Sequence, residues 1–216
     1  MRRTRIKICG ITRPEDAISA VEAGADAIGM VFHAASPRAI DAERALRIID
    51  SLPPLVAKVG VFVDPDPDDL RALLRRVPLD LLQFQGDETP EFCNGFDRPY
   101  IKAVRVRAGV SIVDLERRHP AAAGLLLDSF AADIAGGTGR EFDWGLIPRD
   151  LQKPVILAGG LTAENVGVAI RQVRPYAVDV SGGVESEKGR KDPARIFAFS
   201  AAVADAVRRL ASADYS

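Results

Sequence analysis

The sequence predicts an α/β protein folded as a single (βα)8 TIM barrel domain over residues 1–216. Short apolar segments alternate with segments whose apolar residues recur at helical spacing. The short segments are apolar on both faces, as parallel strands covered by helices are. Eight such units give about 27 residues each, which suits a closed barrel of eight strands. A doubly wound open sheet, usually with five or six strands, is the alternative.

The expected strands are short apolar runs bounded by Gly, Asp or Pro. Branched aliphatic side chains dominate them and suit a pleated backbone that is buried on both faces. The strands are expected at residues 5–9, 27–32, 56–63, 81–85, 100–106, 124–128, 155–158 and 177–181.

The segments between the strands carry helix start signals. Side-chain oxygens at four positions can accept hydrogen bonds from the free amides of a first helical turn. Proline stands near several starts, where its missing N–H costs least. The predicted N-caps are Thr12, Asp41, Asp66 and Thr162. The expected helices include residues 14–23, 42–51, 67–76, 163–173 and a long last one at 193–211.

Composition and charge argue against several functional classes. The 29 Lys+Arg residues nearly balance the 30 Asp+Glu residues, so neither a nucleic acid nor an anionic membrane is an expected partner. Lys7 and Gly10 interrupt the apolar run that a signal peptide would need. The two cysteines have no CxxC spacing and suit a reducing cytosol, so a cytoplasmic protein is expected. His33 and His119 lack metal-ligand spacing and are expected to be structural.

Two polar residues at strand ends can form a proton-transfer pair. Cys9 ends the first expected strand, and Asp128 ends the sixth. Active sites of (βα)8 barrels lie at the carboxyl ends of the strands, so this thiol and this carboxyl can meet over one cavity. Each residue alone has a simpler explanation, since a buried Cys often acts as a small apolar residue and an Asp often caps a helix.

Glycine-rich turns follow the last two expected strands. Glycine lets backbone N–H groups approach an anion closely, and the loops after strands seven and eight are the usual phosphate site of this barrel. The predicted phosphate-binding residues are Gly159, Gly160, Ser181, Gly182 and Gly183. Glycines that only form tight turns are the alternative. A third glycine-rich segment, at 136–139, matches no nucleotide-binding pattern and is expected to be a flexible loop that could close over the site.

Seven motifs, in order along the chain, resemble those of the phosphoribosylanthranilate isomerase family, (βα)8 enzymes of tryptophan biosynthesis. Unrelated phosphate-binding barrels would share at most the last two motifs. The motifs are KICGIT at 7–12, SPR at 36–38, QFQGDE at 83–88, LDS at 127–129, GGTG at 136–139 with FDW at 142–144, LAGGL at 157–161 and DVSGGVE at 179–185.

This resemblance implies an Amadori rearrangement of N-(5-phosphoribosyl)anthranilate to 1-(2-carboxyphenylamino)-1-deoxyribulose 5-phosphate. The reaction needs an acid that protonates the furanose ring oxygen and a base that removes the C2′ proton. The resemblance implies that Asp128 is the acid and Cys9 is the base. No cofactor or metal is called for, because the substrate imine acts as the electron sink. The expected partner is a small phosphorylated substrate, bound by a monomer or a homodimer.

Arg38, Gln83 and Asp179 are the expected substrate-binding residues. A planar guanidinium can hold a carboxylate through two hydrogen bonds, so Arg38 is expected to bind the anthranilate carboxylate. Gln83 and Gln85 share a strand face and are expected to line the pocket. Asp179 is expected to bind a ribose hydroxyl or to support the acid. Phe32 can pack on the substrate ring or in the core.

The proposed chemistry requires opposite behaviour of the two groups. Cys9 must lose a proton although a free thiol has a pKa near 8.5, and Lys7, on the same strand face, is expected to lower that pKa. Asp128 must keep a proton although a free Asp has a pKa near 3.9, and burial between aliphatic strands would raise that pKa.

The sequence departs from the family pattern at three places, none of them the acid or the base. Gln85 stands where a His is usual, 181–183 reads Ser-Gly-Gly in place of a double serine before glycine, and 188–189 reads Lys-Gly where Pro-Gly is common.

Two alternative functions stay open at this stage. A sugar-phosphate synthase or epimerase would need a catalytic Lys–Glu pair or His ligands for a metal. A non-catalytic barrel that binds a phosphorylated metabolite and regulates a partner would need neither Cys9 nor Asp128.

Overall fold

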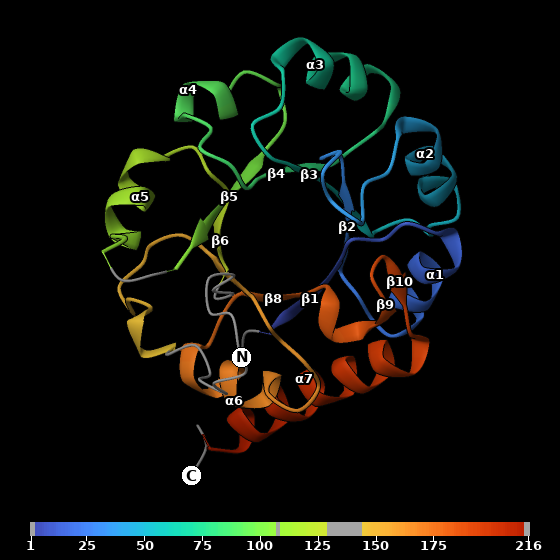
Figure 1. Cartoon of the computed structure of the whole chain (residues 1–216). Helices are drawn as coiled ribbons and strands as arrows, with labels where there is room; N and C mark the ends of the chain where they lie inside the picture. Colours follow the sequence, from blue (N-terminus) through green and yellow to red (C-terminus); the bar gives the residue numbers. More distant parts are fainter. Residues whose placement is uncertain (1–2, 107–108, 129–143, 214–216) are drawn as a thin grey trace.

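The computed structural model describes residues 3–106, 109–128 and 144–213. Eight parallel strands close into a barrel in chain order, and the helices surround it (Figure 1). The predicted (βα)8 barrel is therefore confirmed. The strands are β1 (Arg5–Cys9), β2 (Ala27–Val31), β3 (Ala57–Phe62), β4 (Leu81–Phe84), β5 (Tyr100–Arg105), β6 (Gly124–Asp128), β7 (Val155–Ala158) and β8 (Ala177–Val180). The loop at 136–139 and parts of two motifs lie outside the described residues.

The helices follow the strands in the expected alternation. In Figure 1 the short hairpin of β9 and β10 lies beside α1, after β8 and before the last helix. The α-helices are α1 (Pro14–Glu22), α2 (Ala42–Asp50), α3 (Pro67–Arg76), α4 (Pro90–Cys93), α5 (Ile112–Arg118), α6 (Val166–Val173) and α7 (Pro193–Ala213). The short elements are the 3-10 helices η1 (Trp144–Leu146) and η2 (Gly182–Val184) and the strands β9 (Glu185–Glu187) and β10 (Arg190–Lys191).

Two of the four predicted N-caps are confirmed. Asp41 accepts a hydrogen bond from the Arg44 amide at 2.8 Å, and Asp66 accepts from two amides of α3. The predicted caps Thr12 and Thr162 are wrong. Thr12 donates its hydroxyl to the Gly189 carbonyl at 2.6 Å, because the distant hairpin folds against it. A turn follows Thr162, so α6 begins only at Val166.

Alternating residues of each strand face the barrel interior or the surrounding helices. A large apolar cluster, which includes Ile8 and Leu127, fills the space between strands and helices. A small apolar cluster within the barrel consists of Ile101, Leu126, Ile156, Ala158 and Ala177. Lys7 and Asp179, which are paired in register on β1 and β8, instead make the interior polar where the barrel closes.

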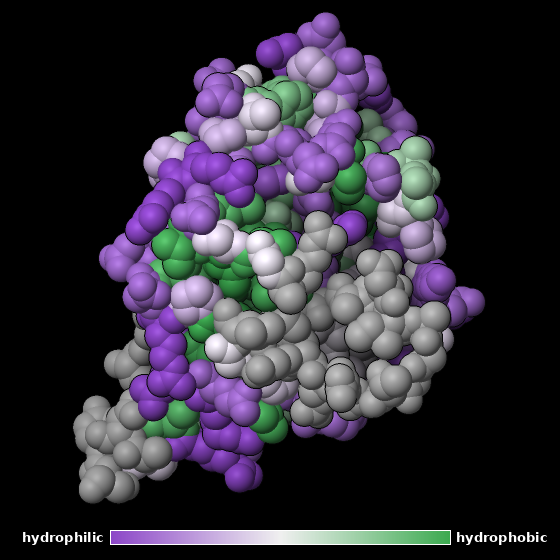
Figure 2. Space-filling model, turned by 60° about the vertical axis from the view of Figure 1, so that its left-hand side comes forward, coloured by the Kyte–Doolittle hydropathy of each residue, from purple (hydrophilic) through white to green (hydrophobic). Residues whose placement is uncertain are grey.

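Much of the described surface is polar on one face of the barrel. In Figure 2, hydrophilic residues cover most of the coloured part of this face, and hydrophobic residues form smaller areas between them. Within the described part of the chain, no helix has the length and apolar character that crossing a membrane requires.

Candidate active site

One cavity of about 690 Å³ lies at the carboxyl ends of the strands. The residues that line it end or follow β1, β2, β3, β4, β6, β7 and β8, so loops from most of the barrel contribute to it. The structure thus brings most of the predicted site residues to one place. These are Cys9, Arg38, Asp128, Gly159, Gly160, Asp179, Ser181, Gly182 and Gly183.

Cys9 lies half-buried at the end of β1, close to the ammonium group of Lys7. A Cβ atom added to Gly29 would lie 2.7 Å from the Cys9 sulfur and 3.1 Å from Lys7 Nζ. Only glycine therefore leaves room for both groups beside β2. Burial raises the pKa of the Cys9 thiol, while the charge of Lys7 and its hydrogen bond oppose that rise. The expected influence of Lys7 is present, but burial is stronger and the pKa ends above its ordinary value.

Lys7 also forms a buried ion pair with Asp179. Its Nζ lies 2.9 Å from Asp179 Oδ1, and both side chains are less than 10% exposed. Burial lowers the pKa of Lys7, but Asp179 and Cys9 together outweigh burial and raise that pKa above its ordinary value. Lys7 therefore stays protonated and carries a positive charge between a thiol and a carboxylate.

Asp128 lies on the other side of the barrel from Cys9. It ends β6 directly after Leu125, Leu126 and Leu127, which are fully buried, and it is itself half-buried. Its neighbours in register are Arg105 on β5 and Ala158 on β7. The alternation of the strand turns its side chain to the same interior face as Leu126, toward the cavity that it lines.

The two glycine-rich loops meet directly. A Cβ atom at Gly183 would lie 2.0 Å from the Leu161 carbonyl oxygen, so only glycine allows the loop after β8 to pack on the loop after β7. Gly159 and Gly160 have φ angles of 89° and 62°, which favour glycine. All four glycines of these loops, 159, 160, 182 and 183, line the cavity.

Arg38 lines the cavity and is held by a carboxylate of the hairpin. Its Nε and Nη2 donate to Glu185 at 2.7 and 2.6 Å. Lys191 donates to the same carboxylate at 2.8 Å. Sequence reasoning missed the roles of Glu185 and Lys191, and the only available signal was that Glu185 ends the motif at 179–185.

Gln83 does not lie along the cavity with the other predicted residues. Gln83 is 0% exposed and lies within β4, two residues before Gln85. Gln85, which follows β4, does line the cavity. Neither amide atom of Gln83 has a hydrogen-bond partner among the described residues. Phe32 stacks on Phe62 with ring centroids 5.4 Å apart, which agrees with the core alternative. His33 lines the cavity, although it was expected to be structural.

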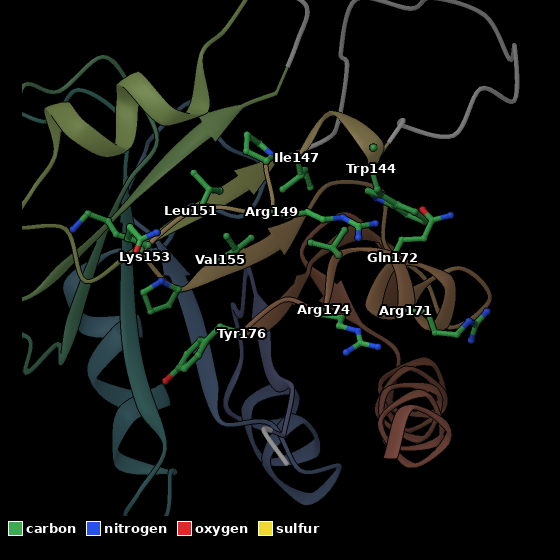
Figure 3. Close-up of a pocket in the computed structure, with 15 residues that line it drawn as sticks. Trp144, Ile147, Arg149, Leu151, Lys153, Val155, Arg171, Gln172, Arg174 and Tyr176 are labelled. Carbon is green, nitrogen blue, oxygen red and sulfur yellow. The ribbon is translucent and has the colours of Figure 1, made fainter. Parts of the chain in front are cut away.

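A larger cavity of about 1050 Å³ lies between η1, β7 and α6 (Figure 3). Cationic and apolar side chains line it, including Arg149, Arg171, Arg174 and Leu151. Its lining residues in the described part of the chain include neither a thiol nor a carboxyl. The larger cavity therefore lacks the groups that acid–base catalysis needs, and the smaller cavity is the candidate active site. The described residues also contain no group of three His, Cys, Asp or Glu side chains placed to hold a metal ion.

Comparison with known proteins gives one consistent result. The family model described as N-(5'phosphoribosyl)anthranilate (PRA) isomerase matches residues 6–202. An N-(5'-phosphoribosyl)anthranilate isomerase of Pseudomonas putida (strain GB-1) is 59% identical over 206 residues, which is 95% of this chain and 100% of the relative.

Solved structures agree with that result. The phosphoribosyl anthranilate isomerase of Thermotoga maritima is 43% identical, with a TM-score of 0.84 over 94% of this chain and 99% of that chain. A phosphoribosyl anthranilate isomerase in complex with reduced 1-(o-carboxyphenylamino)-1-deoxyribulose 5-phosphate is 41% identical, with a TM-score of 0.81 over 94% and 99% of the two chains.

Proposed function

The chain belongs to the N-(5′-phosphoribosyl)anthranilate isomerase family of tryptophan biosynthesis, and we propose that Cys9 and Asp128 carry out its acid–base chemistry. One observation carries this proposal: a thiol from β1 and a carboxyl from β6 line the same cavity. A single ribose held between them would present its ring oxygen to one group and its C2′ proton to the other. The chemistry then requires no group beyond these two side chains and the substrate imine.

The proposed reaction has three steps. Asp128 gives its proton to the furanose ring oxygen, and the ring opens to a Schiff base between C1′ and the anthranilate nitrogen. The Cys9 thiolate then removes the proton from C2′, and the electron pair of that C–H bond moves toward the imine to give an enolamine. The enolamine gains a proton at C1′ and loses the hydroxyl proton at C2′, which gives the ketone.

Lys7 raises the share of thiolate at Cys9 above what burial alone would leave. Burial alone would leave almost no thiolate near neutral pH, because it raises the pKa of Cys9. The Lys7 ammonium favours the charged sulfur and, through its ion pair with Asp179, is fixed beside it. Lys7 is thus a positioning and charge-setting residue, and Asp179 supports it in addition to any contact with the ribose.

The remaining cavity residues fit the two charged ends of the substrate. Backbone amides of the loops after β7 and β8 would bind the phosphate, since these loops pack together around Gly183. The Arg38 guanidinium would bind the anthranilate carboxylate, because it lines the cavity and presents planar paired donors. The ribose would then lie between Cys9 and Asp128.

The test follows the loss of substrate fluorescence on adding freshly purified protein. Cys9→Ser and Asp128→Asn are each expected to lower kcat by roughly 10²–10⁴-fold, the usual contribution of a general acid or base. Both variants should still bind the reduced product analogue. Cys93→Ser is the matched control, because Cys93 is fully buried and does not line the cavity. Turnover at the wild-type rate in either active-site variant would contradict the assignment.

We also propose a cytoplasmic location and a phosphorylated small molecule as the partner. Both cysteines of the chain are free thiols, and Cys9 must stay reduced to accept a proton. Treatment with a thiol oxidant should therefore abolish turnover, and a reductant should restore it. Turnover that survives full oxidation of Cys9 would contradict its role as the base.

A further inference from the structure

Three charged side chains form a connected cluster behind the cavity wall, called the Arg38–Glu185–Lys191 triad below. Arg38 follows β2, Glu185 begins β9, and Lys191 ends β10. Arg38 and Lys191 both donate to Glu185 Oε1, at 2.7 and 2.8 Å, and Arg38 also donates to Oε2 at 2.6 Å. The Glu185 side chain is 5% exposed and the Lys191 side chain is 0% exposed. Two cations therefore share one buried carboxylate, which neutralises one of their two positive charges.

The charge balance of the triad depends on Lys191. An Arg38–Glu185 pair alone would be neutral and would attract an anion weakly. The ammonium of Lys191 gives the triad a net charge of about +1, which an incoming carboxylate can balance. Burial lowers the pKa of Lys191 below its ordinary value of 10.5, and the adjacent Glu185 carboxylate limits that fall because it favours the charged form.

The geometry leaves one side of the Arg38 guanidinium for a ligand. A guanidinium has five N–H donors, and Glu185 takes one from Nε and one from Nη2. Within the described residues, Nη1 has no hydrogen-bond partner. The end formed by Nη1 and the second Nη2 hydrogen is therefore available for two parallel hydrogen bonds to a carboxylate. Of the three triad residues, only Arg38 lines the cavity.

The hairpin that carries Glu185 and Lys191 is tied to the loop after β1. The Gly189 amide donates to Glu185 at 3.3 Å, and the Gly189 carbonyl accepts from Thr12 at 2.6 Å. The Lys191 amide donates to Asp16 at 3.2 Å. These contacts hold the carboxylate in place before a ligand arrives, so Arg38 does not need to be ordered on binding.

We propose that Glu185 and Lys191 are positioning residues for the carboxylate of the substrate. Glu185 fixes the orientation of the Arg38 guanidinium, and Lys191 restores the positive charge that Glu185 would otherwise cancel. This inference rests on the proposed function, in which Arg38 binds the anthranilate carboxylate. It adds two residues that do not touch the substrate and that influence its carboxylate through Arg38.

Binding of two matched ligands tests this role. One is the reduced product analogue with its carboxylate, and the other is the same phenylamino ribulose phosphate without the carboxyl group. Calorimetry gives the Kd of each ligand for each variant. Lys191→Met is expected to raise the Kd of the carboxylate ligand roughly tenfold and the Kd of the second ligand less than twofold. The reason is that only the first ligand contacts Arg38 through a carboxylate.

Binding is measured in place of turnover for a physical reason. The charge of Lys191 also lowers the pKa of Cys9, so a change in kcat would mix two effects. Lys191 further contacts Ser181, at 3.1 Å to its carbonyl and 3.4 Å to its hydroxyl, which couples it to the loop after β8. A loss caused by that loop would weaken both ligands equally, because both carry the phosphate.

Further variants complete the design. Lys191→Arg keeps the positive charge and should restore the wild-type ratio of the two Kd values. Lys191→Gln gives the same charge test if the methionine variant does not fold. Arg190→Met is the matched control, since it removes an exposed cation from the same strand. It should leave both affinities unchanged.

The outcomes separate this inference from the function beneath it. If Arg38→Met weakens both ligands equally, Arg38 does not bind the carboxylate and that part of the proposed function is wrong. If Arg38→Met affects only the carboxylate ligand while Lys191→Met affects both equally or neither, the role of the triad is overturned.

Discussion

The thiol of Cys9, the proposed base, has surroundings that shift its pKa in two directions. Burial raises its pKa, the Lys7 charge lowers it, and the Asp179 carboxylate raises it again. In the proposed mechanism the Lys7 cation, two residues before Cys9 on β1, therefore influences the base without contacting the C2′ proton. The balance among these three groups decides how much thiolate is present at neutral pH.

Replacement of Lys7 tests this balance. In Lys7→Met, the pH midpoint of Cys9 alkylation by iodoacetamide should move to higher pH, because the largest opposing charge is lost. In Lys7→Met/Asp179→Asn, the midpoint should fall between those of Lys7→Met and wild type, since Asp179 no longer raises the pKa. Mass spectrometry of the peptide that contains Cys9 gives the rate at each pH.

Two controls make the alkylation measurement specific. Burial raises the pKa of Cys93 to about 12, so its reaction should be slow, and a Cys93→Ser background removes it entirely. Lys58→Met removes a lysine of β3 that pairs with Asp80, away from the cavity, and should leave the midpoint unchanged. An identical midpoint in Lys7→Met and wild type would show that Lys7 does not influence the thiol.

Single residues differ in how far the sequence could predict their roles. Cys9 and Asp128 end apolar strands, so the fold itself indicates that they face the cavity. The ion pair of Lys7 with Asp179 joins residues 172 positions apart, and it exists only because the barrel closes between β1 and β8. Gln83 shares a face with Gln85, but strand alternation alone does not tell how deep a residue lies.

At the scale of elements, the start of α3 depends on one side chain. Asp66 accepts from the amides of Asp68 and Asp69, which have no partner within the helix. Asp66→Ala should lower the free energy of unfolding by about 1 kcal/mol, measured by urea denaturation. Asp66→Asn keeps a side-chain oxygen that can accept these hydrogen bonds, and it should lower the free energy of unfolding much less. Equal losses in the two variants would show that the negative charge, and not the cap, stabilises the helix.

A buried ion pair connects β5 to the loop after β4. Lys102 donates to Glu88 at 2.7 Å, and both side chains are under 5% exposed. The other Glu88 oxygen accepts from the amides of Asp64 and Gly86, which links the loops after β3 and β4. The two loops that carry Gln85 and Val63 to the cavity are thus held by one carboxylate.

Removal of one partner of the Lys102–Glu88 pair should destabilise the fold. Lys102→Met leaves a buried carboxylate unpaired and is expected to lower the free energy of unfolding by about 3–5 kcal/mol. Lys102→Met/Glu88→Gln should recover part of that loss, because no buried charge remains. Urea denaturation of the two single variants and the double variant gives the coupling energy. A loss below about 1 kcal/mol in Lys102→Met would contradict the importance of the pair.

The elements themselves were largely predictable, and the exceptions share a cause. The strands β1, β6 and β7 and the helix α3 have the predicted bounds, because apolar runs and a Pro-containing start mark them. The hairpin of β9 and β10 was not predicted, since its few residues are mostly charged and show no strand pattern. Thr12 was predicted as a cap but binds that hairpin instead. In both exceptions, contacts with residues far away in the sequence determine the local structure.

For the whole molecule, closure of the barrel assembles the site. The register pairs of β1 with β8 bring the N-terminal strand beside Asp179 and the Ser181 loop. The same closure places the hairpin against α1 and the Arg38 loop, so that the first forty residues and the last forty form one wall of the cavity. Asp128, at the end of β6, approaches from the other side of the barrel. The closed sheet therefore couples folding of the two chain ends to the assembly of the site.

The acid stability of the whole molecule should depend on His119. This residue caps α5, is 5% exposed, and places its Nδ1 3.3 Å from the Tyr100 hydroxyl. Burial lowers its pKa below the ordinary value of 6.5, so the unfolded chain binds a proton at a higher pH than the folded chain does. The stabilising contribution is therefore present above pH 6.5 and is lost as the pH falls below it. For one proton the slope is at most about 1.4 kcal/mol per pH unit.

Replacement of this histidine should remove that part of the pH dependence. The free energy of unfolding of His119→Gln, measured in urea at pH 7.5, 6.5 and 5.5 and constant ionic strength, should fall less steeply with acid than that of wild type. Burial raises the pKa of Glu185, but its hydrogen bonds with Arg38 and Lys191 outweigh burial and hold that pKa below its ordinary value of 4.5, so this carboxyl leaves the window unaffected. The same slope in both proteins would show that His119 takes up no extra proton on unfolding, and the acid sensitivity of the barrel would then have to arise elsewhere.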